Sequence, residues 1–92
     1  MGMALVERRV QVVNEQGMHA RPAAEFVTIA SKYQSEIQLG RDDSYVNGKS
    51  IMGVMTLAAE CGCELVIRAE GPDAEPAATA LVELVQRGFG ES

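Results

Sequence analysis

The chain has 92 residues, of which 47% are hydrophobic and only 4% aromatic, and this predicts a single domain over residues 1–92 with an aliphatic core. A formal net charge of -5 argues against a general nucleic-acid-binding protein, because such proteins need a basic surface. The sequence has neither an apolar run long enough to cross a membrane nor a signal-peptide layout, so we expect a cytoplasmic protein.

The first half of the chain contains a strand, a helix and two further strands, as its hydrophobic spacing indicates. Valines separated by polar residues over 5–14 predict a half-buried strand, and Gly17 then supplies a flexible turn. From His19 the apolar spacing becomes helical, and Pro22 falls in the first turn, where its missing N–H costs nothing. The helix is expected to end near Lys32, a cation suited to a helix C-terminus. Two strands follow, over 35–41 and 44–48.

The second half is expected to contain a helix, a strand and a second helix. A short helix is expected over 49–61, with Ser50 as its N-cap and Gly62 at its end. Residues 63–71 alternate as a fourth strand. The last helix lies within 71–90, with Asp73 as its cap, Gly88 at its end, and an apolar stripe of Ala77, Ala80, Leu81, Leu84 and Val85. The order β-α-β-β-α-β-α predicts an α+β fold, in which helices cover one face of an antiparallel or mixed sheet.

The only histidine of the chain, His19, stands immediately before the first predicted helix. Backbone N–H groups at a helix start have no partner within the helix, and with the macrodipole they form an anion site. Arg21, two residues further on, adds a planar cation suited to a phosphate or carboxylate. The imidazole could therefore be a nucleophile toward phosphorus. The alternative is a solvated loop residue or a hydrogen bonder at the helix start.

Two segments resemble one known family. "GMHARPAAEFV" (17–27) is similar to the active-site segment of HPr, the histidine-containing phosphocarrier of the phosphoenolpyruvate-dependent sugar phosphotransferase system. "VNGKSIMGVMTLAA" (46–59) resembles the regulatory-serine region of the same family, at the family's separation. The resemblance implies the HPr-like open-faced β-sandwich, a four-stranded antiparallel sheet with three helices on one face.

The resemblance also implies roles for the histidine segment. His19 matches the residue that accepts a phosphoryl group on Nδ1 from enzyme I and gives it to a sugar-specific enzyme IIA. Arg21 matches the arginine that stabilises this group, and the backbone of Ala20 and Arg21 would bind it at the helix start. The chain would then be a phosphorelay carrier that its partners turn over, not an enzyme by itself, and it would need no cofactor.

The second segment carries the expected regulatory and docking residues. By resemblance, Ser50 is the site phosphorylated by HPr kinase/phosphorylase, a role compatible with its being an N-cap. Ile51, Met52 and Met55 match an exposed apolar surface where partners dock, and adaptable methionines suit several partners in turn. Lys49 could add a positive charge to this surface. Without the resemblance, such methionines would be core filler.

Cys61 and Cys63 are one residue apart, and the family implies no role for them. A disulfide between such close neighbours would be strained, so the pair is not a secreted disulfide framework. Two thiols and one distant histidine fall short of a structural zinc site. We interpret both cysteines as small residues packed at a helix–strand junction, and we expect no metal.

Three other hypotheses remain open. The chain could serve the nitrogen branch as an NPr-type carrier, or act as a purely regulatory copy in an incomplete phosphotransferase system. It could be a non-phosphorylated interaction module that binds a regulator through its Met-rich helix. The last-ranked alternative is a metal-binding domain that uses His19, Cys61 and Cys63, and it predicts metal retained after purification. A carrier must keep its docking face available, so we expect a monomer.

Overall fold

The computed structural model describes residues 4–57 and 59–90. Residues 1–3, 58 and 91–92, which the expected domain or the expected second helix included, lie outside these ranges. The elements follow the predicted order, with one 3₁₀ turn added at the end. They are β1 (Ala4–Gln11), α1 (Ala20–Ala30), β2 (Glu36–Arg41), β3 (Ser44–Asn47), α2 (Ile51–Thr56), β4 (Glu64–Gly71), α3 (Ala74–Gln86) and η1 (Gly88–Gly90).

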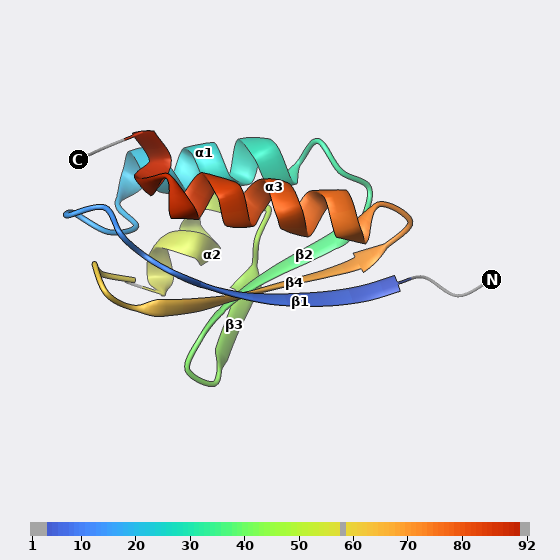
Figure 1. Cartoon of the computed structure of the whole chain (residues 1–92), viewed down its shortest axis with the longest axis horizontal. Coiled ribbons are helices and arrows are strands. Elements are labelled where there is room, and N and C mark those ends of the chain that lie inside the picture. Colours follow the sequence, from blue (N-terminus) through green and yellow to red (C-terminus); the bar gives the residue numbers. More distant parts are fainter. Residues whose placement is uncertain (1–3, 58, 91–92) are drawn as a thin grey trace.

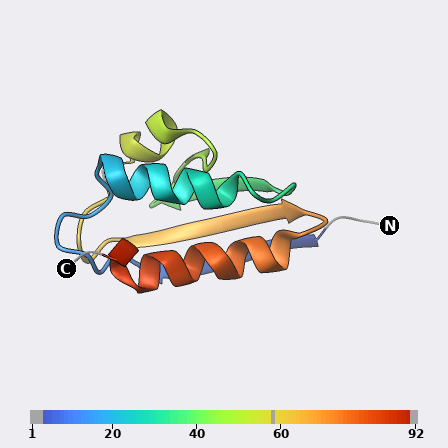
Figure 2. The same cartoon turned by 90° about the horizontal axis from the view of Figure 1, so that it is seen from above.

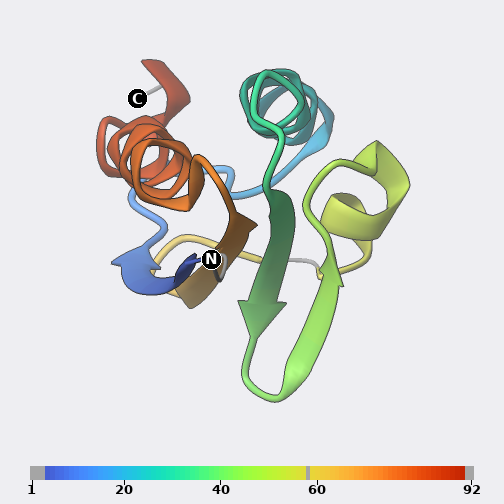
Figure 3. The same cartoon turned by 90° about the vertical axis from the view of Figure 1, so that its right-hand side faces the viewer.

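The four strands form one antiparallel sheet in the order β1-β4-β2-β3. All three helices lie on the same face of this sheet, as the end-on view shows (Figure 3). Helices α1 and α3 run side by side along the strands (Figures 1 and 2), and α1 contacts both α2 and α3. The predicted α+β fold, an open-faced sandwich with an antiparallel sheet, is confirmed.

The aliphatic core lies between the sheet and the helices. In β4, Leu65, Ile67 and Ala69 are buried toward the helices, as the two-residue period of a strand requires. Phe26 of α1 and Leu81 of α3 are fully buried in the same cluster. Burial of each large apolar side chain contributes about 1.5–3 kcal/mol, which is what fixes the helices on this face.

One aromatic ring, that of Tyr45, lies across the opposite, open face of the sheet. Tyr45 of β3 lies across Gly40 of β2, where an added Cβ would come within 2.3 Å of the ring. The Arg68 guanidinium stacks 4.0 Å from the centroid of the Tyr45 ring, a cation–π contact. Arg68 also donates to Glu7 at 3.0 Å. Charged and aromatic side chains therefore cover this face, and Val66 beneath them is only 5% exposed.

Two predicted boundaries are wrong. Strand β1 ends at Gln11 and not at 14, because Val12 turns to pair with the loop before β4, donating its N–H to the carbonyl of Cys63 at 2.8 Å. Helix α2 ends at Thr56, well before Gly62. Arg41 donates to the carbonyl of Leu57 at 3.1 Å, and a cation at this position stabilises a helix C-terminus.

The predicted capping role of the Asp73 side chain is also wrong. Asp73 occupies the N-cap position of α3, but its carboxylate makes no capping hydrogen bond to that helix. The carboxylate instead accepts hydrogen bonds from the hydroxyl and N–H of Ser35 and from the N–H of Gln34. These bonds lower the pKa of Asp73 below its ordinary value, and the bond from the Ser35 hydroxyl has the largest effect. The carboxylate thus ties the start of α3 to the segment leading into β2.

Candidate functional site

His19 is the N-cap residue of α1. Its backbone is extended, with φ of -88° and ψ of -168°, and its carbonyl accepts the first helical hydrogen bond, from the N–H of Ala23, at 3.0 Å. The imidazole is half-buried and makes no capping hydrogen bond to α1. The amides of Ala20 and Arg21 precede the first helical bond, and such amides point out of the helix start, where the macrodipole is positive. The structure therefore places the imidazole beside an electropositive helix end.

The loop before His19 is held by backbone contacts. Gly17 has a positive φ of 68°, and a Cβ at this position would lie 2.5 Å from the carbonyl oxygen of Ala59. Met18 donates its N–H to that same oxygen at 2.8 Å. Asn14, which is only 1% exposed, donates from its side chain to the Gly17 carbonyl at 2.8 Å. The position of His19 thus depends on a loop from another part of the chain.

Arg21 reaches the C-terminal segment of the chain. Its Nη2 donates to the carbonyl of Phe89 at 3.2 Å. Phe89 is buried and has a positive φ of 56°, so the η1 turn places its carbonyl against the start of α1. The sequence interpretation missed this contact. The only local signal for it is the pair of glycines around Phe89, which marks a turn but not where the turn packs.

Ser50 is the N-cap of α2, as predicted. Its Oγ accepts a hydrogen bond from the N–H of Gly53 at 3.1 Å, and its carbonyl accepts from Val54 at 2.9 Å. Phosphate on this oxygen would sit at a helix N-terminus, where negative charge is favourable.

The outer face of α2 is apolar and exposed. Met52 is 77% exposed, Ile51 43% and Met55 41%, whereas Val54 of the same helix is fully buried. The alternative of methionine core filler is therefore wrong for Met52 and Met55. Lys49 does not project onto this surface as an unattached cation, since its Nζ donates to the carbonyl of Tyr33, just beyond α1, at 2.8 Å.

The two cysteines lie in the turn before β4. Cys63 is half-buried and packs against the core cluster, as the packing interpretation requires, but Cys61 is exposed, so that interpretation is wrong for Cys61. Within residues 4–57 and 59–90, no three His, Cys, Asp or Glu side chains gather so that they could hold a metal ion.

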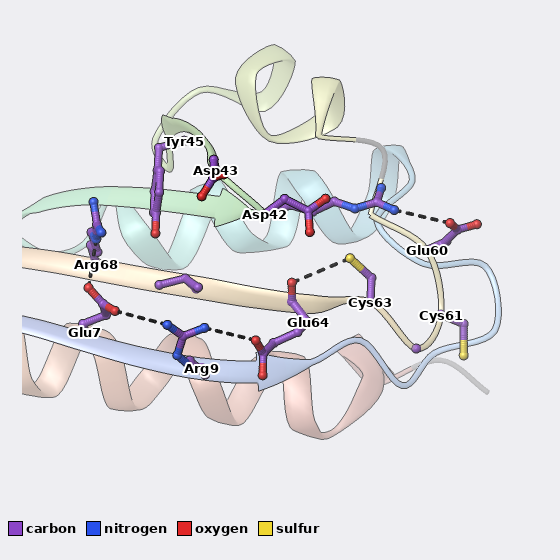
Figure 4. Close-up of a pocket in the computed structure, with 13 residues that line it drawn as sticks. Glu7, Arg9, Asp42, Asp43, Tyr45, Glu60, Cys61, Cys63, Glu64 and Arg68 are labelled. Atoms are coloured by element: carbon purple, nitrogen blue, oxygen red, sulfur yellow. Dashed lines mark hydrogen bonds and ion pairs between the residues drawn. The ribbon is translucent and has the colours of Figure 1, made fainter.

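A wide, open hollow lies away from His19. Its volume is about 930 Å³, and it lies over the open face of the sheet and the 60–63 turn (Figure 4). Neither His19, Arg21 nor Ser50 lines it.

In the part of the chain that the structure describes, no helix is both long and apolar enough to cross a membrane.

Comparisons with known proteins agree with the resemblance found in the sequence. Residues 6–87 match a family model described as "PTS HPr component phosphorylation site". The chain is 51% identical over 87 residues to the phosphocarrier protein HPr of Treponema pallidum (strain Nichols), covering 95% of this chain and 99% of that protein. The crystal structure of HPr-C-His from Thermoanaerobacter tengcongensis has a TM-score of 0.90 at 46% identity, covering 95% of this chain and 98% of that one.

A second crystal structure from Thermoanaerobacter tengcongensis is that of an HPr dimer. Its TM-score is 0.75 at 48% identity, and the match covers 89% of this chain and 94% of that one. The expectation of a monomer is therefore not confirmed by these relatives.

The fold and the sequence matches extend over nearly the whole chain. They include the helix start at which His19 and Arg21 stand, and the α2 region with Ser50. The chain belongs to the HPr family of phosphocarriers of the phosphotransferase system.

Proposed function

We propose that Nδ1 of His19 accepts a phosphoryl group from enzyme I and passes it to sugar-specific enzyme IIA components in the cytoplasm. The observation that carries this proposal is the position of the imidazole at the N-cap of α1, where it is not used to cap the helix. A phosphoryl group on the ring can then meet the positive end of α1. The nitrogen attacks phosphorus while the bond from phosphorus to the donor breaks. In the onward step, a nucleophile of the acceptor attacks phosphorus and the bond from phosphorus to Nδ1 of His19 breaks.

Arg21 supports the transfer as a stabilising cation. Its guanidinium is exposed but tethered to the Phe89 carbonyl at 3.2 Å. Charge-assisted hydrogen bonds from a guanidinium to phosphoryl oxygens are about twice as strong as neutral ones. We therefore expect Arg21 to turn toward the phosphoryl oxygens when His19 is loaded. Such a switch would stabilise the phosphohistidine without holding it so tightly that onward transfer stalls.

The partners dock, in this proposal, on the apolar surface of α2 formed by Ile51, Met52 and Met55. These three side chains remain exposed although they are apolar, which favours an interaction surface. α2 contacts α1, so a partner seated there would also reach the helix that begins after His19. The chain would act as a monomer, because one copy must meet several partners in turn.

Ser50 would carry a second, regulatory phosphate from HPr kinase/phosphorylase. Its position as the N-cap of α2 makes the added charge compatible with the helix. The same charge would stand directly beside Ile51 and Met52. It would oppose partners that bind the unmodified apolar surface, because they would have to bury it.

The proposal is tested by intact-mass spectrometry after incubation with phosphoenolpyruvate and a general enzyme I from the same cell. His19 is the only histidine in the chain, so the single variant His19→Ala shows whether a histidine is the phosphorylated residue, and the modified residue need not be mapped by peptide analysis. An acid-labile phosphate adduct on the wild type that the variant lacks supports the proposal. No adduct on the wild type, or an equal adduct on a variant that circular dichroism shows to be folded, overturns it.

A further inference from the structure

Cys61 and Cys63 share one tight turn. Cys63 donates its N–H to the carbonyl of Glu60 at 2.9 Å, closing a four-residue turn with Cys61 and Gly62 at its centre. Gly62 has a φ of 92°, which a type II turn requires at its third residue. A Cβ at Gly62 would meet nothing within 4 Å, so the turn faces open space.

The two thiols are reduced and point in different directions. The sulfur of Cys61 is directed to the Val13 carbonyl at 3.7 Å. The sulfur of Cys63 is directed to the Glu64 carbonyl, also at 3.7 Å, as Figure 4 shows. Cys61 is exposed and Cys63 half-exposed, on the rim of the large hollow over the open face. A small reagent in solution can therefore reach the pair, Cys61 first.

We propose that Cys61 and Cys63 are a redox pair that closes to a disulfide by exchange with a low-molecular-weight disulfide, and that closure slows phosphoryl acceptance at His19. The Cys61 thiolate attacks one sulfur of the reagent, forming a mixed disulfide and releasing one thiol. The Cys63 thiolate then attacks the Cys61 sulfur and releases the second thiol. The protein loses two protons and two electrons in all, and the reagent gains both as its two thiols are released.

The spacing allows this bond but strains it. Two Cα–Cα steps of about 3.8 Å set an upper limit of about 7.6 Å between the Cα atoms of Cys61 and Cys63. Because the chain turns at Gly62, the separation is shorter than this limit, and disulfides occupy the range of roughly 4.4–6.8 Å. Both side chains must leave their carbonyl partners to meet. Strained and exposed disulfides are the labile, regulatory ones, and disulfides of reducing compartments are mostly transient and redox-sensing.

The cysteine turn is bonded directly to the segment that leads to His19. Val12 donates to the carbonyl of Cys63 and accepts from the N–H of Gly62, both at 2.8 Å. One residue before the turn, Ala59 accepts the N–H of Met18 at 2.8 Å. A change of the turn therefore acts at both ends of the 12–18 loop, and Met18 is the direct neighbour of His19.

The effect on His19 rests on the proposed function, whereas the formation of the disulfide does not. Closing the ring moves the Cys61 sulfur away from Val13 and alters the backbone to which Val12 is bonded. We expect this displacement to reduce the rate of phosphoryl acceptance by at least about fivefold, the lower end of usual coupling between sites. Reduction of the bond should restore the rate.

The first measurement is the intact mass of the native full chain after treatment with oxidised glutathione and alkylation of the remaining thiols. The expected product has lost two hydrogens and carries no alkyl group. A lasting glutathione adduct on Cys61, or two alkylated thiols, overturns the redox pair. This result is independent of whether His19 accepts phosphate.

The second measurement follows phosphorylation by phosphoenolpyruvate and enzyme I after the oxidant has been removed. Oxidised and reduced wild type are compared with Cys61→Ser/Cys63→Ser carried through the same steps, or with Cys61→Ser alone if the double variant fails to fold. Slower acceptance by the oxidised wild type only, reversed by a thiol reductant, supports the coupling. Equal rates for oxidised and reduced wild type overturn it. Failure of the reduced wild type to accept phosphate would contradict the proposed function instead.

Discussion

The N–H of Met18 donates to the carbonyl of Ala59 at 2.8 Å, and this bond joins the residue before His19 to the loop that follows α2. The two segments are 41 positions apart in the sequence, since 59 − 18 = 41. Gly17 permits the close approach, because it has no Cβ where the Ala59 carbonyl passes. The candidate site therefore depends on a tertiary contact that is as tight as a secondary-structure bond.

Gly17→Ala should be strongly destabilising. The new Cβ would lie 2.5 Å from the Ala59 oxygen and 2.8 Å from the Glu60 Cα, at a φ of 68°. Left-handed strain and overpacking together predict a loss of about 2–5 kcal/mol in the free energy of unfolding by urea. Gly62→Ala is the matched control, because it has a φ of 92° and nothing within 4 Å. Equal losses for the two variants would show that the contact with Ala59 does not matter.

Arg21→Ala should slow phosphoryl transfer while leaving the fold intact. The exposed guanidinium makes a hydrogen bond to the Phe89 carbonyl, so we expect its removal to change stability by less than about 1 kcal/mol. Loss of one stabilising cation is expected to slow acceptance by about tenfold to a hundredfold. Single-turnover phosphorylation measures this, with Arg9→Ala on the open face of the sheet as the control. An unchanged rate would remove Arg21 from the site.

Ser50→Ala should separate the capping role from the regulatory one. Loss of the hydrogen bond from Gly53 to Oγ is expected to cost about 1 kcal/mol of unfolding free energy. Ser50→Asp keeps an acceptor at the N-cap and adds negative charge, so its stability should stay near that of the wild type. Only Ser50→Asp should weaken binding of enzyme I, measured by calorimetry. Equal affinity of the Asp variant and the wild type would contradict regulation through charge.

Met52→Ala should leave stability unchanged and weaken partner binding. Because its side chain is 77% exposed, the substitution should change the unfolding free energy by less than about 0.5 kcal/mol. The loss of apolar contact should lower the affinity for enzyme I by about tenfold, as expected for a central docking residue. Leu5→Ala provides the control, since Leu5 is 64% exposed but belongs to β1. Partners that tolerate Met52→Ala and lose affinity with Leu5→Ala would place the docking surface on the sheet edge.

Asp73→Asn should destabilise the chain at neutral pH but not in acid. Hydrogen bonds from Ser35 and Gln34 favour the ionised carboxylate, so its folded-state pKa lies below the ordinary 3.8. Its stabilising contribution is therefore fully present above pH 3.8 and is lost as the pH falls through the lower folded value. Urea midpoints of wild type and variant, measured from neutral pH downward, should converge in acid. A difference that persists below the folded pKa would mean that the ionised form is not the source of the stability.

The sequence by itself determined the order of elements and the identity of the family. Both follow from local signals: the change from a two-residue to a helical period at His19, the capping serine at position 50, and the two family segments around them. Capping by Ser50 was predictable because its donor, Gly53, is only three residues away. Exposure of Met52 was predictable only through the resemblance, since α2 is too short for its period to identify the buried face.

Only the tertiary structure decided which distant groups complete each local feature. Asp73 stands at the start of α3, as its sequence position implies. Its carboxylate nevertheless accepts hydrogen bonds from Ser35 and makes no capping hydrogen bond to α3. Helix α2 ends at Thr56, where Leu57 is buried and its carbonyl accepts a hydrogen bond from Arg41. Arg21 donates to the carbonyl of Phe89. Propensity and period act over one or two helical turns. These partners are selected instead by the packing of the helices on the sheet, which brings together groups that no local pattern relates.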